Sequence, residues 1–327
     1  MTQNLAKLNN IYRKHTSEDE LYCSTIVTTM RHILLVLLLS TLGLATHAQG
    51  SNHAPLRAAL QQVADTTDGR LGIALWQVEA GDTITLGNSQ HYPMQSTYKL
   101  PLALYILHLA DEGKLKLDEP IYIPASTLDT NTWSPMLKDH PNQGFFSLSI
   151  QELLAYTIGL SDNNACDILF RQAGGTQPVH KYIHSLGIQD MAIAATEAEM
   201  AKGWQVQYTN WCTPMAMAQL LHRLYNGQLL GKASTALLMD MMANSLNSAS
   251  RIKGMLPPGT PVAHKTGTSN SQASITGAVN DVGIITLPNG KHLIVSVYVS
   301  NFTGGTARGE AIIAVVSRLA YNYFSTR

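Results

Sequence analysis

Residues 275–300 read ITGAVNDVGIITLPNGKHLIVSVYVS, and this stretch decides the architecture of the chain. Two β-favouring runs, Ile275–Leu287 and His292–Ser300, flank the tripeptide Pro288-Asn289-Gly290. Asn-Gly between two such runs favours a tight hairpin turn. The stretch therefore predicts two long antiparallel strands near the C-terminal end.

The N-terminal part of the chain mirrors this pattern. Leu71–Val78 and Thr83–Leu86 are short β-favouring runs joined by Glu79-Ala80-Gly81-Asp82, which indicates another hairpin. Pro261–Ser269 is a further strand candidate just before the C-terminal pair. Strands at both ends with other structure between them predict one sheet assembled from both termini.

Apolar residues recur at helical spacing elsewhere. One stripe follows Pro55 and is broken by Asp68-Gly69, and another covers Arg308–Phe324, after a glycine-rich turn. The helix candidates between the strand regions are Leu100–Leu109, Ile150–Thr157, Asn164–Arg171, Pro214–Leu224 and Ser234–Met242. The expected fold class is therefore α/β: an antiparallel sheet built from both termini and flanked by helices, plus an inserted all-α lobe. The sheet lobe would cover about 49–98 and 255–327 and the helical lobe about 99–254, with a cleft where they meet.

Composition narrows the class of protein. Of 327 residues, 45% are apolar and 13% are charged, with 22 basic residues against 22 acidic ones. This apolar fraction excludes a chain that is disordered throughout. A net charge of zero argues against a nucleic-acid-binding protein, which needs an excess of basic residues. No apolar run reaches the roughly 18 residues of a membrane span. A globular protein without a nucleic-acid partner is expected.

The first 48 residues resemble a targeting segment. Met30-Arg31-His32 precedes an apolar run over Ile33–Ala45, and small residues follow up to Ala48. This pattern predicts a secretory signal peptide cleaved after Ala48, with Met30 as the true start, and a periplasmic or secreted product. The alternative is a buried N-terminal helix. No Cys follows the apolar run, so a stable membrane anchor is not expected.

Cleavage would leave Cys166 and Cys212 in the mature chain of residues 49–327. The two could pair in an exported protein, or remain two buried thiols, and the sequence leaves both possibilities open. The 12 histidines form no H-E-x-x-H or H-x-H pattern, so neither a metal nor another cofactor is expected.

Ser96-Thr97-Tyr98-Lys99 precedes an apolar helical run. If the helix begins near Ser96, then Ser96 and Lys99 lie one turn apart on the same face. A hydroxyl at the positive end of a helix, beside a desolvated amine that accepts a proton, suits nucleophilic catalysis. Ser96 as an N-cap and Lys99 as a surface residue would explain the pattern equally well.

Two tripeptides follow in order. Ser161-Asp162-Asn163 precedes a helix candidate and could be a plain N-cap, and Lys265-Thr266-Gly267 lies in a strand candidate and could be a solvent-facing strand end. Each motif is weak by itself. Their combination, in this order and after Ser-x-x-Lys, is specific.

With these motifs the mature chain resembles the class A serine β-lactamases over essentially its whole length. The resemblance implies a β-lactamase/transpeptidase-like fold and, as partners, β-lactam small molecules, with a monomeric enzyme expected. It implies Ser96 as the acylated nucleophile and Lys99 as a proton acceptor beside it. Ser161 would relay a proton to the ring nitrogen, with Lys265 close by. Asn163, Thr266, Gly267, Thr268 and Ser269 would bind substrate, and backbone N–H groups of Ser96 and Thr268 would form the oxyanion hole.

Glu197, in Thr196-Glu197-Ala198-Glu199-Met200, matches the glutamate that orients the hydrolytic water in this family. A carboxylate within reach of a water molecule separates a hydrolase from an enzyme that stays acylated. Glu199 is an immediate competitor for this role, and a plain surface glutamate is the other interpretation.

The sequence departs from the family pattern in two respects. The asparagine usual four residues after the glutamate is replaced by Ala201, and the usual arginine–aspartate ion pair is replaced by Ala195 and Asn210. These departures resemble a divergent extended-spectrum, cephalosporinase-like subgroup. They predict a differently built loop with room for bulky cephalosporin side chains.

Two other functions share this chemistry. A cell-wall DD-peptidase uses similar serine and lysine residues, but that group lacks a dedicated deacylating glutamate. A non-catalytic β-lactam sensor would acylate and signal, usually from a membrane-tethered domain. The motif position of Glu197 favours a serine β-lactamase that confers antibiotic resistance over both.

Overall fold

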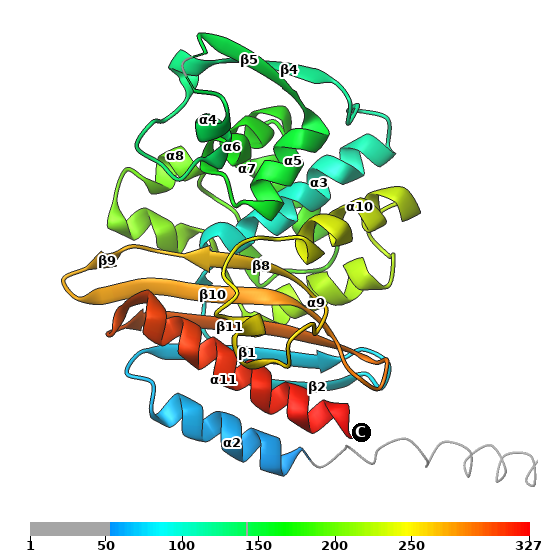
Figure 1. Ribbon diagram of the computed structural model, residues 1–327, viewed down its shortest axis with the longest axis vertical. Helices are drawn as coiled ribbons and strands as arrows, with labels where there is room; N and C mark the ends of the chain where they lie inside the picture. The colour runs from blue at the N-terminus through cyan, green and yellow to red at the C-terminus, as the bar shows by residue number, and fades with distance from the viewer. Residues whose placement is uncertain (1–52, 142) are drawn as a thin grey trace, which may run out of the picture. The chain divides into compact units, whose positions relative to one another are not determined.

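The computed structural model describes residues 53–141 and 143–327, so the predicted signal peptide, the proposed start at Met30 and Cys23 lie outside the described residues. Its main sheet has the strand order β2-β1-β11-β10-β8, with the short β9 paired to β10 (Figure 1). Every pairing in it is antiparallel. The strands are β1 (Arg70–Gln77), β2 (Asp82–Leu86), β8 (Val262–Thr268), β9 (Ser271–Gln272), β10 (Ile275–Thr286) and β11 (His292–Phe302).

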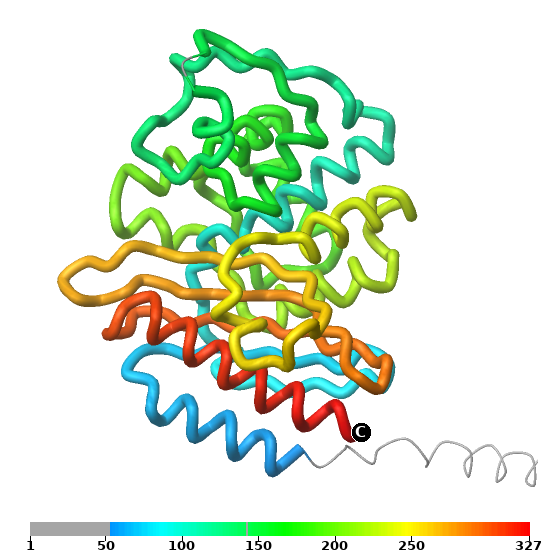
Figure 2. Tube along the Cα trace, viewed as in Figure 1, coloured from blue at the N-terminus to red at the C-terminus, as the bar shows by residue number. Residues whose placement is uncertain are grey.

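The C-terminal hairpin is confirmed, with β10 and β11 paired from Thr276 opposite Phe302 to Thr286 opposite His292. Gly290 has a φ of 78° in the connecting turn, a conformation that glycine adopts without strain. β1 from the N-terminal hairpin lies beside β11, so the sheet is assembled from both ends of the chain (Figure 2).

The sheet is covered on both faces because its strands are apolar on alternating sides. Leu71, Ile73 and Leu75 belong to the core shared with helices α2 (Ala54–Asp65) and α11 (Gly305–Ser325). Ala74, between them in β1, belongs to the other core, which extends into the helical lobe. The expected α/β fold class is confirmed, with helices flanking an antiparallel sheet (Figure 1).

The five helix candidates between the strand regions are all present. They are α3 (Lys99–Asp111), α5 (Ile150–Gly159), α6 (Asn163–Gln172), α9 (Pro214–Tyr225) and α10 (Lys232–Ala243). The other α-helices of the helical lobe are α4 (Pro135–Asp139), α7 (Thr176–Ser185) and α8 (Glu197–Met200). The 3-10 helices are η1 (Gln95–Tyr98), η2 (Ala125–Thr127), η3 (Trp204–Thr209) and η4 (Ile252–Met255).

Some elements differ from the prediction. Part of the region expected to be helices and loops forms a two-stranded sheet of β4 (Pro120–Pro124) and β5 (Phe145–Ser149). Proline at both ends of β4 hid this strand, because proline weakens a strand signal. A second small sheet joins β3 (Tyr92–Pro93), β7 (Trp211–Cys212) and β6 (Met191–Ala192). The last helix begins at Gly305, earlier than the expected Arg308, directly after the left-handed N-cap Gly304, whose φ is 94°.

Candidate active site

A cleft of about 920 Å³ opens between the sheet and the helical lobe, beside Ser96. Ser96 lies in η1, immediately before α3, so the expectation that a helix begins near this serine is confirmed. Most of the sequence-predicted site residues line the cleft: Ser96, Ser161, Asn163, Glu197, Thr266, Gly267, Thr268 and Ser269. Lys99 and Lys265 are completely buried and reach this set through hydrogen bonds and an ion pair.

The Lys99 ammonium joins three elements of the helical lobe. Its Nζ donates to the Ser161 carbonyl oxygen at 2.8 Å and to Asn163 Oδ1 at 2.6 Å. It also lies 3.0 Å from Glu197 Oε1. Asn163 in turn donates from Nδ2 to Thr132 Oγ1 at 2.7 Å. A buried cation held by two neutral acceptors and one carboxylate stays in a single place.

Ser161 is held in an unusual backbone conformation, with a φ of 58°. Such a conformation costs energy for a residue other than glycine and persists where the surroundings enforce it. The next residue supplies that enforcement, because Asp162 is the N-cap of α6 and its buried carboxylate accepts from Ala165 N, Ser134 Oγ and Met136 N. Burial raises the pKa of Asp162 above its usual value.

The Ser161 hydroxyl accepts a hydrogen bond from Lys265 Nζ at 2.8 Å, and the same ammonium donates to the Thr266 carbonyl oxygen at 3.0 Å. Both partners of Lys265 are neutral. Burial lowers the pKa of Lys265 well below its usual value, and the nearby charge of Lys99 lowers it further. A serine from the helical lobe and a lysine from β8 thus meet across the cleft.

Gly267 lets strand β8 approach the turn that carries the nucleophile candidate. A Cβ at this position would lie 2.6 Å from the Met94 carbonyl oxygen and 3.2 Å from Ser96 N. No side chain fits at those distances, so only glycine permits the approach. The backbone of β8 therefore runs directly against the Ser96 turn, beyond which Thr268 and Ser269 line the cleft.

Arg251 is a cleft residue that the sequence reasoning missed. Its buried guanidinium donates from Nη2 to Thr268 Oγ1 at 2.6 Å and from Nη1 to the carbonyl oxygens of Gly267 and Asn280, each at 2.9 Å. Glu310 on α11 lies 3.2 Å from Nε. A lone arginine before a short 3-10 helix carries no local motif, so nothing in the sequence marks it.

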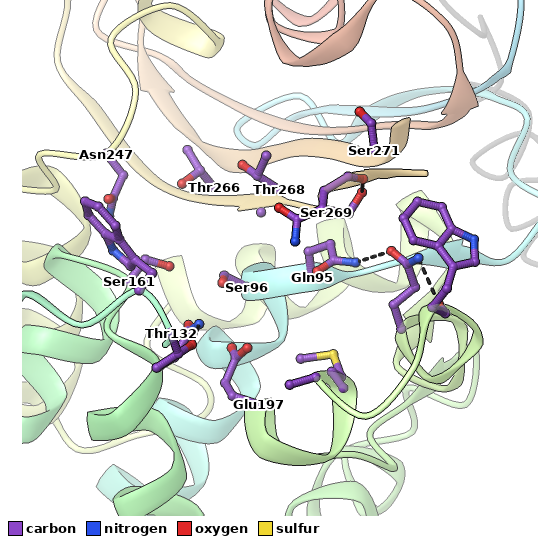
Figure 3. A pocket seen from close by; sticks show the side chains of 18 of the residues that line it. Gln95, Ser96, Thr132, Ser161, Glu197, Asn247, Thr266, Thr268, Ser269 and Ser271 are labelled. Atoms are coloured by element: carbon purple, nitrogen blue, oxygen red, sulfur yellow. Dashed lines mark hydrogen bonds between the residues drawn. The ribbon is translucent and has the colours of Figure 1, made fainter. Parts of the chain in front are cut away.

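Glu197 and its competitor Glu199 point in different directions. Glu199 forms a capping box with Thr196, accepting from the Thr196 backbone N–H at 2.8 Å. The Glu197 carboxylate instead points from α8 toward Ser96, inside the cleft (Figure 3). Of the two acids, the structure brings Glu197 to the nucleophile candidate and to Lys99.

Asp167 is a second residue that the sequence reasoning missed. Its two carboxylate oxygens accept the consecutive backbone N–H groups of Glu197 and Ala198, at 2.8 and 2.9 Å. Burial raises the pKa of Asp167 to about 6. The first turn of α8, which carries Glu197, is therefore capped by a carboxylate from α6 that titrates near neutrality.

The loop that contains α8 is closed by an amide. Asn210 Oδ1 accepts from the backbone N–H groups of Ala194 and Ala195, at 2.7 and 2.9 Å, and Asn210 Nδ2 donates to the Ala195 carbonyl oxygen at 2.8 Å. These bonds lie where the family pattern has an ion pair. The expected difference in loop construction is therefore present.

The far end of the loop contacts the Ser96 turn. Gln95, at a φ of 48°, donates from Nε2 to Gln207 Oε1 at 2.6 Å (Figure 3). Met200, Ala201 and Trp204 line the cleft on this side. The small side chain of Ala201 leaves space there that the family's usual asparagine would fill.

Of the two possibilities for Cys166 and Cys212, a disulfide or two free thiols, the described part of the chain shows two buried, unpaired thiols. His264, expected to be a strand residue, lies in β8. No helix among the described residues is both long and apolar enough to cross a bilayer.

Comparisons with known proteins agree with this geometry. The sequence profile of the beta-lactamase enzyme family matches residues 55–324. The extended-spectrum beta-lactamase PER-1 of Pseudomonas aeruginosa is 38% identical over 268 residues, covering 82% of this chain and 87% of that protein. A beta-lactamase from Chitinophaga pinensis has a crystal structure with a TM-score of 0.81 and 44% identity, covering 83% of this chain and 99% of that one. A class A beta-lactamase structure from Bacteroides cellulosilyticus has a TM-score of 0.79 and 33% identity, covering 83% and 98%.

Proposed function

The chain belongs to the beta-lactamase enzyme family, as a class A serine β-lactamase that hydrolyses β-lactams and gives antibiotic resistance, and on this premise we propose the role of each residue in the cleft. The observation that carries the proposal is the 3.0 Å contact between Lys99 Nζ and Glu197 Oε1, beside the Ser96 turn. It supports an acid–base pair next to the nucleophile.

In acylation, Ser96 Oγ attacks the β-lactam carbonyl carbon and its proton passes to the Lys99–Glu197 pair. The carbonyl oxygen becomes an oxyanion between the backbone N–H groups of Ser96 and Thr268, and each such donor contributes on the order of 3 kcal/mol. When the ring C–N bond breaks, Ser161 delivers a proton to the departing nitrogen. The 2.8 Å hydrogen bond from Lys265 to Ser161 Oγ supports this relay.

In deacylation, Glu197 accepts a proton from a water molecule, whose oxygen attacks the ester carbon. The tetrahedral intermediate collapses, the bond to Ser96 Oγ breaks, and the proton returns to that oxygen. The direction of the Glu197 side chain in Figure 3 supports this role. Glu199 takes no part, because its carboxylate is engaged in capping.

Substrate is bound from both sides of the cleft. We assign its carboxylate to Lys265, Thr266, Gly267, Thr268 and Ser269, joined by Arg251, whose Nη2 already contacts Thr268 Oγ1. Asn163 would hydrogen-bond the acylamino side chain, which matches its place on the cleft wall. Planar donors such as guanidinium suit a carboxylate because they hold it in a fixed orientation.

The functional assignment is tested with purified protein and nitrocefin. We expect continuous colour with turnover far above stoichiometric, because Glu197 releases the acyl-enzyme. A single stoichiometric burst would contradict the proposal and indicate a DD-peptidase or a sensor that stays acylated. The control is the protein inactivated beforehand by heat.

The same assay extends to substrate size. Since Ala201 and the amide-closed loop leave space in a cleft of about 920 Å³, we expect a bulky oxyimino-cephalosporin to be turned over at least as efficiently as benzylpenicillin. The extended-spectrum name of the relative PER-1 supports this expectation. Negligible cephalosporin turnover beside rapid penicillin turnover would contradict it.

We also propose that residues 49–327 form one catalytic domain, exported after cleavage behind Ala48 and active as a monomer. The match of the family profile to residues 55–324 supports a domain that begins shortly after this cleavage point.

A pH dependence follows from the capping of α8 by Asp167. Only the ionised carboxylate accepts both backbone N–H groups fully, and with a pKa of about 6 it gains a proton as the pH falls through that value. We expect kcat to fall in this range, because Glu197 loses one of the bonds that orient its helix. Glu197 and Lys99 are the charged groups whose fields act on Asp167.

Asp167→Asn tests this. The two N–H groups bond separate oxygens of Asp167, and in the amide one of these acceptors becomes an NH2 donor. The amide also does not titrate, so we expect kcat at neutral pH to fall about tenfold or more and the decline near pH 6 to disappear. Asp139→Asn, an exposed acid bonded to Tyr156, is the control. If kcat of Asp167→Asn still falls near pH 6 as in the unmodified enzyme, Asp167 is not the group that causes this fall.

A further inference from the structure

A buried histidine–aspartate pair lies behind the cleft, on the opposite face of the sheet from the Lys265 side chain. His264 Nδ1 lies 3.0 and 2.9 Å from the two carboxylate oxygens of Asp281, and both residues are completely buried. Asp281 also accepts the backbone N–H of Ile252 at 3.1 Å. Ile252 follows Arg251 in the chain, so the pair fixes the segment that carries this arginine.

The pair and Lys265 are close in the sheet although their side chains point to opposite faces. Lys265 stands opposite Val282 in the β8–β10 pairing, and Asp281 stands opposite Thr266. Val282 packs in the core of the helical lobe, whereas Ile252, which bonds Asp281, packs in the core beneath α11. One backbone layer therefore separates the buried carboxylate from the buried lysine.

Among the described residues, the ion pairs around the cleft include no acid paired with Lys265. Lys99 pairs with Glu197, and Arg251 pairs with Glu310. Lys265 donates only to a serine hydroxyl and a carbonyl oxygen. A buried ammonium without a counter-charge would lose its proton, since burial penalises the charged form.

Asp281 supplies negative charge if His264 is neutral. Within the described residues, His264 Nε2 is buried and has no hydrogen-bond partner. A neutral ring that donates from Nδ1 leaves only a lone pair unsatisfied at Nε2, whereas an imidazolium would bury a charged N–H donor with no acceptor, which costs more. The pair therefore carries one net negative charge.

We propose that Asp281, held beside a neutral His264, is the counter-charge that keeps Lys265 protonated for binding the substrate carboxylate, and that it sets the alkaline limit of activity. The inference rests on the proposed role of Lys265. Asp281 is a positioning residue, because it acts through the lysine and does not touch substrate. Glu197 and Asp281 raise the pKa of Lys265, whereas burial, Lys99 and Arg251 lower it. Glu197 is already paired with Lys99.

The test compares pH profiles of kcat/KM for benzylpenicillin. In Asp281→Asn we expect the alkaline decline to move to lower pH by about one unit, because the loss of a nearby negative charge lowers the pKa of a buried ammonium. The loss should appear as a raised KM, about tenfold at a pH on the alkaline side, with kcat less affected. His264→Asn keeps a donor toward Asp281 and keeps its charge, so its alkaline limb should coincide with that of the unmodified enzyme.

The outcomes separate charge from structure. An unshifted alkaline limb in Asp281→Asn, or an equal shift in His264→Asn, overturns the inference. Asp111→Asn, which removes another carboxylate that accepts a backbone N–H and a hydroxyl, is the control. If Asp281→Asn does not fold, NMR titration of 13C-labelled lysine in the unmodified protein decides, because a neutral Lys265 at pH 7 without substrate is the overturning result. Absence of hydrolysis at every pH in the unmodified protein would instead refute the proposed function.

Discussion

Ser96→Ala removes β-lactam hydrolysis, with kcat/KM falling by about 10⁴ or more, because no other group replaces the nucleophile of a covalent mechanism. Ser96 lies on η1 at the base of the cleft, and its neighbours Lys99 and Glu197 keep their ion pair in the variant because neither depends on the hydroxyl. The measurement is the loss of β-lactam absorbance, combined with the mass of the intact protein after mixing with substrate.

The mass spectrum distinguishes a missing nucleophile from a damaged site. Ser96→Ala should show no covalent adduct, while the unmodified protein quenched with a slow cephalosporin should show one. Ser185→Ala, which removes a hydroxyl outside the cleft bonded only to the Tyr182 carbonyl oxygen, should match the unmodified enzyme. An adduct that still forms in Ser96→Ala would assign the nucleophile to another residue.

Glu197→Gln should leave acylation possible and slow release of the acyl-enzyme, with kcat falling by about 10² to 10⁴, the usual contribution of a general base. The amide has nearly the shape of the carboxylate but accepts no proton from water. Lys99 keeps its bonds to Ser161 and Asn163, so the surroundings should persist. The measurement is an accumulating mass adduct that equals protein plus substrate.

Glu199→Gln is the matched control, since a glutamine two residues away can still accept the Thr196 N–H and so preserves the capping box of α8. Its steady-state turnover should stay close to that of the unmodified enzyme. Unchanged turnover in Glu197→Gln, or an adduct that accumulates only in Glu199→Gln, would move the deacylating role away from Glu197.

Much of the fold can be predicted from local patterns in the sequence. The Asn289-Gly290 turn and its flanking apolar runs predict the central hairpin, and the helical stripes predict the main helices. The pair β4 and β5 escaped because each strand has only five residues and β4 is bounded by prolines. The pairing of β4 with β5 joins segments that are far apart in the sequence, and local composition does not predict such a pairing.

The residues of the candidate site also fall into two groups, those that local motifs predict and those that they do not. Ser96, Ser161 and Lys265 sit in motifs, so they stand out before any fold is known. Arg251 and Asp167 act through hydrogen bonds to distant segments, Arg251 to β8 and β10 and Asp167 to α8. No spacing rule connects such residues, because only the folded chain brings them together. The amide closure by Asn210 was foreseen only as the loss of an ion pair.

The loop that carries Glu197 is fastened at both ends by uncharged amides, Asn210 at its base and Gln207 at its contact with Gln95. Dissolved salt weakens attraction between exposed charges but hardly affects hydrogen bonds between neutral groups. These two attachments of the loop should therefore persist at low and at high ionic strength alike.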